Sequence, residues 1–121
     1  MTKRSLPLVP TEEQEQIILS TWMTKKGIRH YAVPNGGRRS FSEGVKFKRS
    51  GVSPGVPDIV VPYPRSSYHG LYIELKRKEG GVVSQYQADW LTFLRGQGYR
   101  ADIARGFDEA KAIVEQYLRI S

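Results

Sequence analysis

The chain has 121 residues, of which 39% are hydrophobic and 26% charged, as is usual for a single compact domain with an ordinary core. It has no cysteine, which excludes disulfides, thiolate zinc sites and cysteine nucleophiles, and its two histidines are too few for a histidine-rich metal site. No apolar run approaches the roughly 20 residues that span a bilayer, and the first residues lack the apolar core of a signal peptide, so we expect a cytoplasmic protein.

The net charge of +7 is concentrated in one part of the chain. The segment from Lys25 to Arg49 contains eight basic residues and one acidic residue, whereas the rest of the chain is balanced. Aromatic residues lie between the basic ones, and such a segment can neutralise phosphates and release their counterions. We interpret it as a candidate nucleic-acid-binding region. The alternative interpretation is a solvated loop that keeps the protein soluble.

The first predicted element is a helix from Thr11 to about Lys26, preceded by a flexible arm over residues 1–10. Thr11 is a good N-cap, the next two residues are acidic, and Gly27 ends the helix after two lysines. We expect residues 11–121 to form one domain. The apolar stripe predicted for this helix consists of Ile17, Ile18 and Trp22, with Thr21 at its margin.

The remaining elements follow in chain order and define the fold class. The predicted strands cover residues 28–33, 58–61, 71–76 and 99–104, and the predicted helices cover residues 84–98 and 108–119, with Ser84 and Asp108 as N-caps. The apolar residues assigned to these two helices are Trp90, Leu91, Phe93 and Leu94, then Ala110, Ile113, Val114, Tyr117 and Leu118. Residues 35–57 form a loop too long to be an idle connection, and we expect it to be functional. The order α-β-β-β-α-β-α predicts an α/β fold with a central mixed sheet and helices on both faces.

Two of the predicted strands carry residues that could perform chemistry. Glu74 and Lys76 are two apart on one strand, so their side chains leave the sheet on the same face. If the strand that follows Asp58 pairs with it, two carboxylates and an ammonium group meet. Two adjacent carboxylates need a cation or Lys76 between them, or else one stays protonated with a raised pKa. Oxygen ligands without cysteine or histidine favour Mg²⁺ or Mn²⁺ over zinc. Taken singly, the Glu-x-Lys pair is typical of a salt-bridging surface, and Asp58 of a turn.

Several runs of residues together resemble a known family. They are Gly51-Val52-Ser53-Pro54-Gly55-Val56-Pro57-Asp58, then Tyr72-Ile73-Glu74-Leu75-Lys76, then Ser84-Gln85-Tyr86-Gln87, with Val33-Pro34-Asn35-Gly36 at the end of the first strand. The resemblance is to the VRR-NUC family of the PD-(D/E)xK nuclease superfamily, and it covers the chain from about Thr11 to Ala112. It implies a restriction-endonuclease-like core.

The resemblance also implies a role for each matching residue. Asp58 and Glu74 would bind the metal with the backbone carbonyl of Leu75, Lys76 would be catalytic, and Gln87 would lie beside the site. The family also places an acidic metal ligand on its first helix. Here Glu12 fits best, with Glu13 and Glu15 as alternatives. The residues expected near incoming nucleic acid are Asn35, Arg38, Arg39, Lys46, Lys48 and Arg49.

The function implied by the resemblance is a Mg²⁺- or Mn²⁺-dependent DNA endonuclease. Compact members of the family resemble Holliday-junction resolvases, so we expect branched or junction DNA as the partner and a homodimer as the working form, in an intracellular protein of bacterial or phage origin. The alternative hypothesis is a non-catalytic nucleic-acid-binding module whose acids are structural. The sequence leaves RNA open as a substrate.

Overall fold

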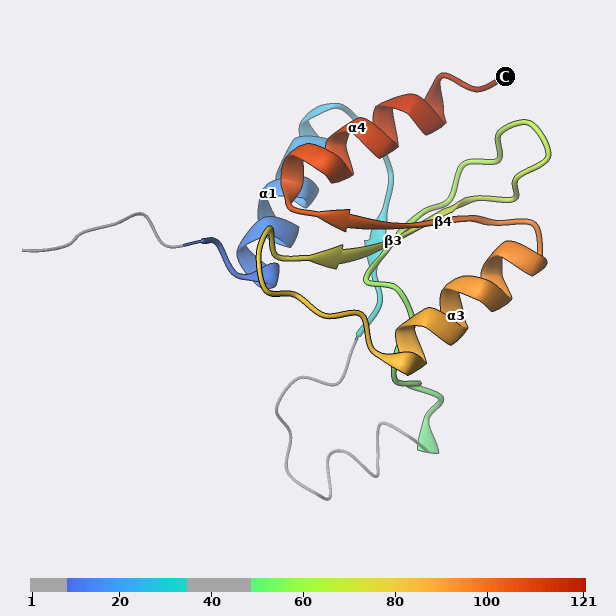
Figure 1. Cartoon of the computed structure of the whole chain (residues 1–121). Helices are drawn as coiled ribbons and strands as arrows, with labels where there is room; N and C mark the ends of the chain where they lie inside the picture. The colour runs from blue at the N-terminus through green and yellow to red at the C-terminus, as the bar shows by residue number, and fades with distance from the viewer. Residues whose placement is uncertain (1–8, 35–48) are drawn as a thin grey trace, which may run out of the picture.

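The structure, a computed structural model, describes residues 9–34 and 49–121 of the chain. The predicted order of elements is confirmed (Figure 1). The elements are α1 (Glu12–Lys25), β1 (Tyr31–Ala32), β2 (Ile59–Val61), β3 (Leu71–Lys76), α3 (Gln85–Gly96), β4 (Arg100–Arg105) and α4 (Phe107–Leu118). No helix in this described part of the chain is both long enough and apolar enough to cross a membrane.

The four strands form one mixed sheet in the order β1-β2-β3-β4. The first two pairings are antiparallel, and β3 pairs in parallel with β4 because α3 carries the chain back across the sheet between them. Side chains alternate along β3, so Leu71, Ile73 and Leu75 point to one face. Glu74 and Lys76 point to the other face together, as the spacing predicts.

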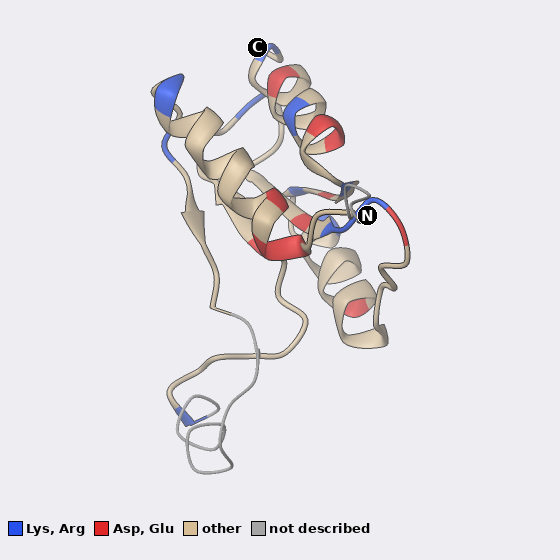
Figure 2. Ribbon diagram, turned by 90° about the vertical axis from the view of Figure 1, so that its left-hand side faces the viewer, with Lys and Arg blue, Asp and Glu red and all other residues tan. Residues whose placement is uncertain are grey.

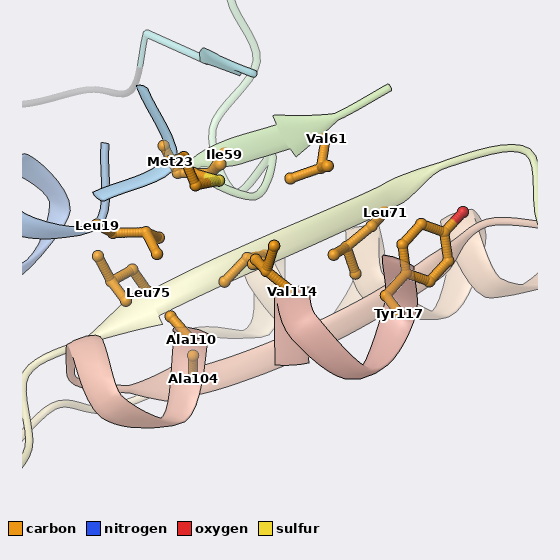
Figure 3. Packing of buried hydrophobic residues seen from close by; sticks show 11 residues of the cluster. Leu19, Met23, Ile59, Val61, Leu71, Leu75, Ala104, Ala110, Val114 and Tyr117 are labelled. Carbon is orange, nitrogen blue, oxygen red and sulfur yellow. The ribbon is translucent and has the colours of Figure 1, made fainter. Parts of the chain in front are cut away.

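Helices cover both faces of the sheet, which confirms the predicted layers (Figure 1). On one face α1 and α4 pack against β2, β3 and β4. Figure 3 shows the resulting core, in which the labelled residues are Leu19, Met23, Ile59, Val61, Leu71, Leu75, Ala104, Ala110, Val114 and Tyr117. On the other face α3 buries Leu91 and Leu94 against Ala101 of β4. The face carrying Glu74 and Lys76 is therefore covered by α3.

Helix α1 starts as predicted but buries a different face. The Thr11 hydroxyl accepts a hydrogen bond from the Gln14 backbone N–H, and the Gln14 side chain accepts one from the Thr11 N–H, which forms a capping box. The predicted apolar stripe is wrong, because Ile17 is 59% exposed and Ile18 is 45% exposed. The buried residues are Glu15, Leu19 and Met23, which are four apart and share one face.

Three smaller predictions also need correction. Phe93 is 54% exposed, because Leu91 and Leu94 are the residues of α3 that are buried against the sheet. Helix α4 has its N-cap at Gly106, where the backbone turns with φ of 89°, so Asp108 lies inside the first turn. The strand predicted over residues 28–33 is reduced to Tyr31 and Ala32. Most of the predicted arm, and residues 35–48 of the predicted loop, lie outside the described residues.

Candidate active site

Asp58 immediately precedes β2, and hydrogen bonds to the neighbouring chain segments fix it. Its side chain is 5% exposed, and its Oδ2 accepts a hydrogen bond of 2.8 Å from the backbone N–H of Leu75 on β3. Its own backbone carbonyl accepts a hydrogen bond of 2.8 Å from the N–H of Val33, just after β1. The carboxylate is thus held in the middle of the sheet, beside the strand that carries Glu74 and Lys76.

A glycine-rich turn brings the chain to Asp58. Gly55 has φ of +91°, in a region that residues with a side chain rarely adopt. A Cβ placed on it would lie 2.5 Å from the carbonyl carbon of Tyr86, at the start of α3. The backbone of this turn therefore touches the backbone of α3. Glycine is required here by both its conformation and its neighbour, which gives a physical reason for this part of the motif.

Glu74 is the most buried charged residue of the site. It is 1% exposed on β3, and burial together with the nearby Asp58 charge raises its pKa to about 8, although Lys76 opposes this shift. Its Oε2 accepts a hydrogen bond from Gln87 and lies 3.5 Å from Nζ of Lys76. Its Oε1 is buried and has no hydrogen-bond partner within the described residues. A carboxylate with one oxygen satisfied and the other open is suited to binding a cation.

Lys76 lies between two carboxylates. Its Nζ is 3.5 Å from Oε2 of Glu74 and 3.8 Å from Oε2 of Glu12, and its side chain is only 6% exposed. Both distances are long for a direct hydrogen bond, so the ammonium group keeps donors for a further partner. Glu12 itself is 44% exposed, at the first turn of α1. It is the first-helix acid that faces the site.

Gln87 joins α3 to the site through one side-chain amide. Its Oε1 accepts from the N–H of Ser84 at 2.9 Å, and its backbone N–H donates to the Ser84 hydroxyl at 3.2 Å, so the two residues form the capping box of α3. Its Nε2 donates to Oε2 of Glu74 at 2.9 Å. The same amide that caps the helix therefore holds the buried carboxylate, as its predicted place beside the site requires.

A cleft runs along the site between α1 and the end of β1. It has a volume of about 660 Å³, and its walls include Glu12, Glu13 and Gln16 from α1, residues 32–34 and Asp58. Figure 2 shows the acidic first turn and the basic last turn of α1 at opposite ends of the helix. The cleft opens beside the acidic end. Asp58 lies at the wall of this cleft, together with the acidic residues of α1.

The described residues suit a cation held by two side chains. Within residues 9–34 and 49–121, no three carboxylates or histidines come close enough together to hold a metal ion. Glu12 thus approaches Lys76 without joining Asp58 and Glu74 in a three-carboxylate cluster. The ligands available to a cation are therefore these two carboxylates, including Oε1 of Glu74, which has no hydrogen-bond partner among the described residues. Oxygen donors of this kind match Mg²⁺ and Mn²⁺.

The fold agrees with comparisons to known proteins. The family model described as the VRR-NUC domain matches residues 10–108. The chain belongs to the VRR-NUC domain family. A solved structure described as a VRR_NUC domain protein is similar to it with a TM-score of 0.81 and 26% sequence identity, over 94% of this chain and 93% of that one. A comparison with curated proteins found no match.

Membership of the VRR-NUC family makes this a nuclease-like domain and implies nucleic-acid binding. The predicted family is thereby confirmed. The structure brings Asp58, Glu74, Lys76 and Gln87 together, with Glu12 beside Lys76. The metal-ligand role of the Leu75 carbonyl stays a prediction. Of the predicted nucleic-acid-binding residues only Arg49 lies within the described residues, and it is exposed; Asn35, Arg38, Arg39, Lys46 and Lys48 lie outside them.

The structure separates the three acids that were alternatives on the first helix. Glu12 contacts Lys76, and Glu13 is exposed along the cleft. Glu15 is buried and points elsewhere, with its Oε1 accepting from the backbone N–H of Phe107 at the start of α4. Its spacing from Leu19 and Met23 was the signal in the sequence. A buried face predicted from apolar residues alone omits a buried glutamate.

Proposed function

We propose that this chain is a Mg²⁺- or Mn²⁺-dependent endonuclease that hydrolyses the phosphodiester bonds of DNA. One observation carries the proposal: Glu74 is buried beside Asp58, with one oxygen that has no hydrogen-bond partner among the described residues and with Nζ of Lys76 3.5 Å from the other. Burying one carboxylate beside another lowers the stability of the folded protein. A function that uses the pair is a reason for the protein to keep it. A buried acid whose pKa is strongly raised by burial and by a neighbouring carboxylate is typical of a functional site, and that neighbour, Asp58, lines the cleft.

Asp58 and Glu74 are the residues that would hold the cation. When bound, a divalent cation acts as a Lewis acid toward the scissile phosphate and favours ionisation of the attacking water. The bond between Asp58 Oδ2 and the Leu75 N–H fixes one carboxylate from the strand side. The bond from Gln87 fixes the other from the helix side, and the remaining oxygen of Glu74 has no hydrogen-bond partner among the described residues.

Lys76 supplies positive charge where the reaction develops negative charge. Its ammonium group is nearly excluded from solvent, which strengthens its interaction with a phosphate group compared with an exposed lysine. It also has donors left to orient an attacking water, because both of its carboxylate contacts are 3.5 Å or longer. Glu12 lies on its outer side and limits the positions that the ammonium can take.

The substrate that we propose is branched DNA, including Holliday junctions, bound mainly through its backbone. The concentration of the whole charge excess between Lys25 and Arg49 supports phosphate binding, and no element for reading base sequence is evident in the chain. One site cuts one strand, so symmetric cleavage of a junction needs two copies. We therefore propose that a homodimer is the working form.

Cleavage assays test this proposal. Purified protein is incubated with junction, flap and linear duplex DNA and with an RNA duplex, in Mg²⁺, in Mn²⁺ and in chelator. We expect metal-dependent cleavage that is strongest on the junction, and a loss of at least about 100-fold in Asp58→Ala and Lys76→Ala. The matched control is Lys111→Ala, which removes a lysine on the opposite face of the sheet. Salt-sensitive binding without cleavage in any metal would favour the non-catalytic binding module instead.

A further inference from the structure

Glu15 is a buried carboxylate that the proposed reaction does not use. It is 2% exposed on α1, yet its Oε1 accepts a hydrogen bond of 3.0 Å from the backbone N–H of Phe107, which is 92 residues away in the sequence. Its other oxygen, Oε2, is buried without a hydrogen-bond partner among the residues that the structure describes. It therefore joins the first turn of α1 to the first turn of α4.

The start of α4 needs such an acceptor. Its N-cap is Gly106, which has no side chain to accept a hydrogen bond from the first N–H groups of the helix. A carboxylate at this end also interacts favourably with the helix dipole. A Cβ on Gly106 would lie 3.3 Å from Oε2 of Glu15 and 2.7 Å from Cγ of Lys78. The glycine leaves the space in which the carboxylate from α1 lies.

This contact between α1 and α4 is connected to Lys76 at two points. The backbone N–H of Gly106 donates to the carbonyl of Lys76 at 2.8 Å. One turn before Glu15 on α1, Oε2 of Glu12 is 3.8 Å from Nζ of Lys76. The contacts thus form a closed path from the Lys76 backbone through α4 and α1 to the Lys76 side chain. Glu15 is the link that ties the two helices together in this path.

The bond does more than satisfy one N–H group of α4. A cap for α4 alone needs only a side chain at its own N-cap, whereas Glu15 makes this bond from α1 and so fixes the two helices relative to each other. We propose that Glu15 is a positioning residue, which holds α1 against α4 so that Glu12 and Lys76 keep their places at the candidate active site. This inference rests on the proposed nuclease function, because position matters here only if Lys76 acts on a substrate.

Two substitutions separate the hydrogen bond from the packing. Glu15→Gln keeps the shape and an oxygen that accepts from the Phe107 N–H. Glu15→Leu keeps an apolar volume of similar size but accepts nothing. The matched control is Glu109→Ala, which removes a carboxylate that accepts from the Arg105 N–H at 2.7 Å in the same turn but does not reach α1.

The assay measures kcat and KM for metal-dependent cleavage, the melting temperature, and the hydrogen-exchange rate of the Phe107 amide. We expect Glu15→Leu to lower kcat by about 10-fold with KM changed by less than about 2-fold, since small displacements of catalytic groups reduce rates more than binding. We expect Glu15→Gln and Glu109→Ala to keep kcat within about 2-fold of the wild type. The Phe107 amide should exchange faster in Glu15→Leu, and the melting temperature should fall in that variant, because the N–H groups at the start of α4 lose their acceptor. The values of kcat are therefore compared at a temperature at which every variant is folded.

The outcomes distinguish this inference from the function on which it rests. If Lys76→Ala cleaves as fast as the wild type, the proposed function fails. If Lys76→Ala is inactive while Glu15→Leu matches Glu109→Ala in kcat, only the positioning role fails. A kcat that falls equally in Glu15→Leu and Glu15→Gln would also overturn it, because the glutamine keeps the hydrogen bond.

Discussion

Gln87 donates a hydrogen bond of 2.9 Å from its side-chain nitrogen to Oε2 of Glu74, while its side-chain oxygen accepts from the N–H of Ser84. The start of α3 and the buried carboxylate of the site are therefore fixed by one amide. The two bonds also set the orientation of that amide, since its nitrogen must face Glu74. Helix capping and the arrangement of the site are coupled at this residue.

Gln87→Ala should lower both stability and activity. The lost capping interaction costs about 0.5–1 kcal/mol of unfolding free energy, and release of Glu74 should reduce cleavage by about 10-fold. Gln14→Ala is the matched control, because Gln14 closes the same kind of capping box on α1 without contacting the site. Urea denaturation and cleavage rates measure the two effects. Equal cleavage rates in the two variants would show that the hydrogen bond to Glu74 does not contribute to activity.

The stability of the metal-free protein should fall as the pH rises, because of Glu74. Its pKa is about 8 in the folded protein against an ordinary value of 4.5, so the folded state holds a proton that the unfolded chain releases. Its stabilising contribution is complete below pH 4.5 and is lost as the pH rises through about 8. Glu74→Gln should lack this slope in the presence of chelator. Parallel pH profiles of unfolding free energy for the two proteins would contradict this assignment.

Binding of Mg²⁺ should release a proton from Glu74. Because the carboxylate must ionise to hold the cation, the apparent affinity should rise by up to about 10-fold per pH unit until the pH reaches the pKa of about 8. Titration calorimetry in two buffers of different ionisation enthalpy measures the number of protons released. The Glu74→Gln protein should release none on mixing with Mg²⁺. Binding to the wild type that is independent of pH would place the cation elsewhere.

Gly55→Ala should destabilise the protein more than Gly51→Ala. Both glycines have positive φ, so each substitution brings backbone strain of about 1–2 kcal/mol. A Cβ on Gly51 meets nothing within 4 Å, whereas a Cβ on Gly55 would lie 2.5 Å from the backbone of Tyr86. The added clash should bring the loss for Gly55→Ala to about 3 kcal/mol. Urea denaturation of both variants gives the comparison, and equal losses would show that the turn can move away from α3.

Features of the fold that depend on neighbouring residues could be predicted from the sequence. Thr11 and Ser84 cap helices through groups three residues away, and both are N-caps in the structure. Glu74 and Lys76 share a face because a strand alternates. The family motif placed Asp58 beside them, although its partner, the Leu75 N–H, is 17 residues away. Local rules and the motif thus predicted three of the four strands, the caps at Thr11 and Ser84, and the central residues of the site.

Features that depend on distant contacts could not be predicted. Ile17 and Ile18 are apolar but exposed, since the core selects the face of α1 that carries Leu19 and Met23. Glu15 belongs to that buried face only because Phe107, far along the chain, offers it an N–H. Phe93 is exposed because neighbouring leucines already fill the contact of α3 with the sheet. For Ile17, Ile18 and Glu15 the deciding partners lie on other elements.

The most direct test of the central claim is the anomalous scattering of Mn²⁺ in a crystal of the protein. If Asp58 and Glu74 bind the cation, we expect one strong peak with oxygens of both residues within roughly 2.0–2.6 Å, the range usual for such cations. The same protein preparation must cleave DNA in Mn²⁺, so that the crystal describes an active protein. A peak that contacts neither carboxylate in such a crystal would contradict the account.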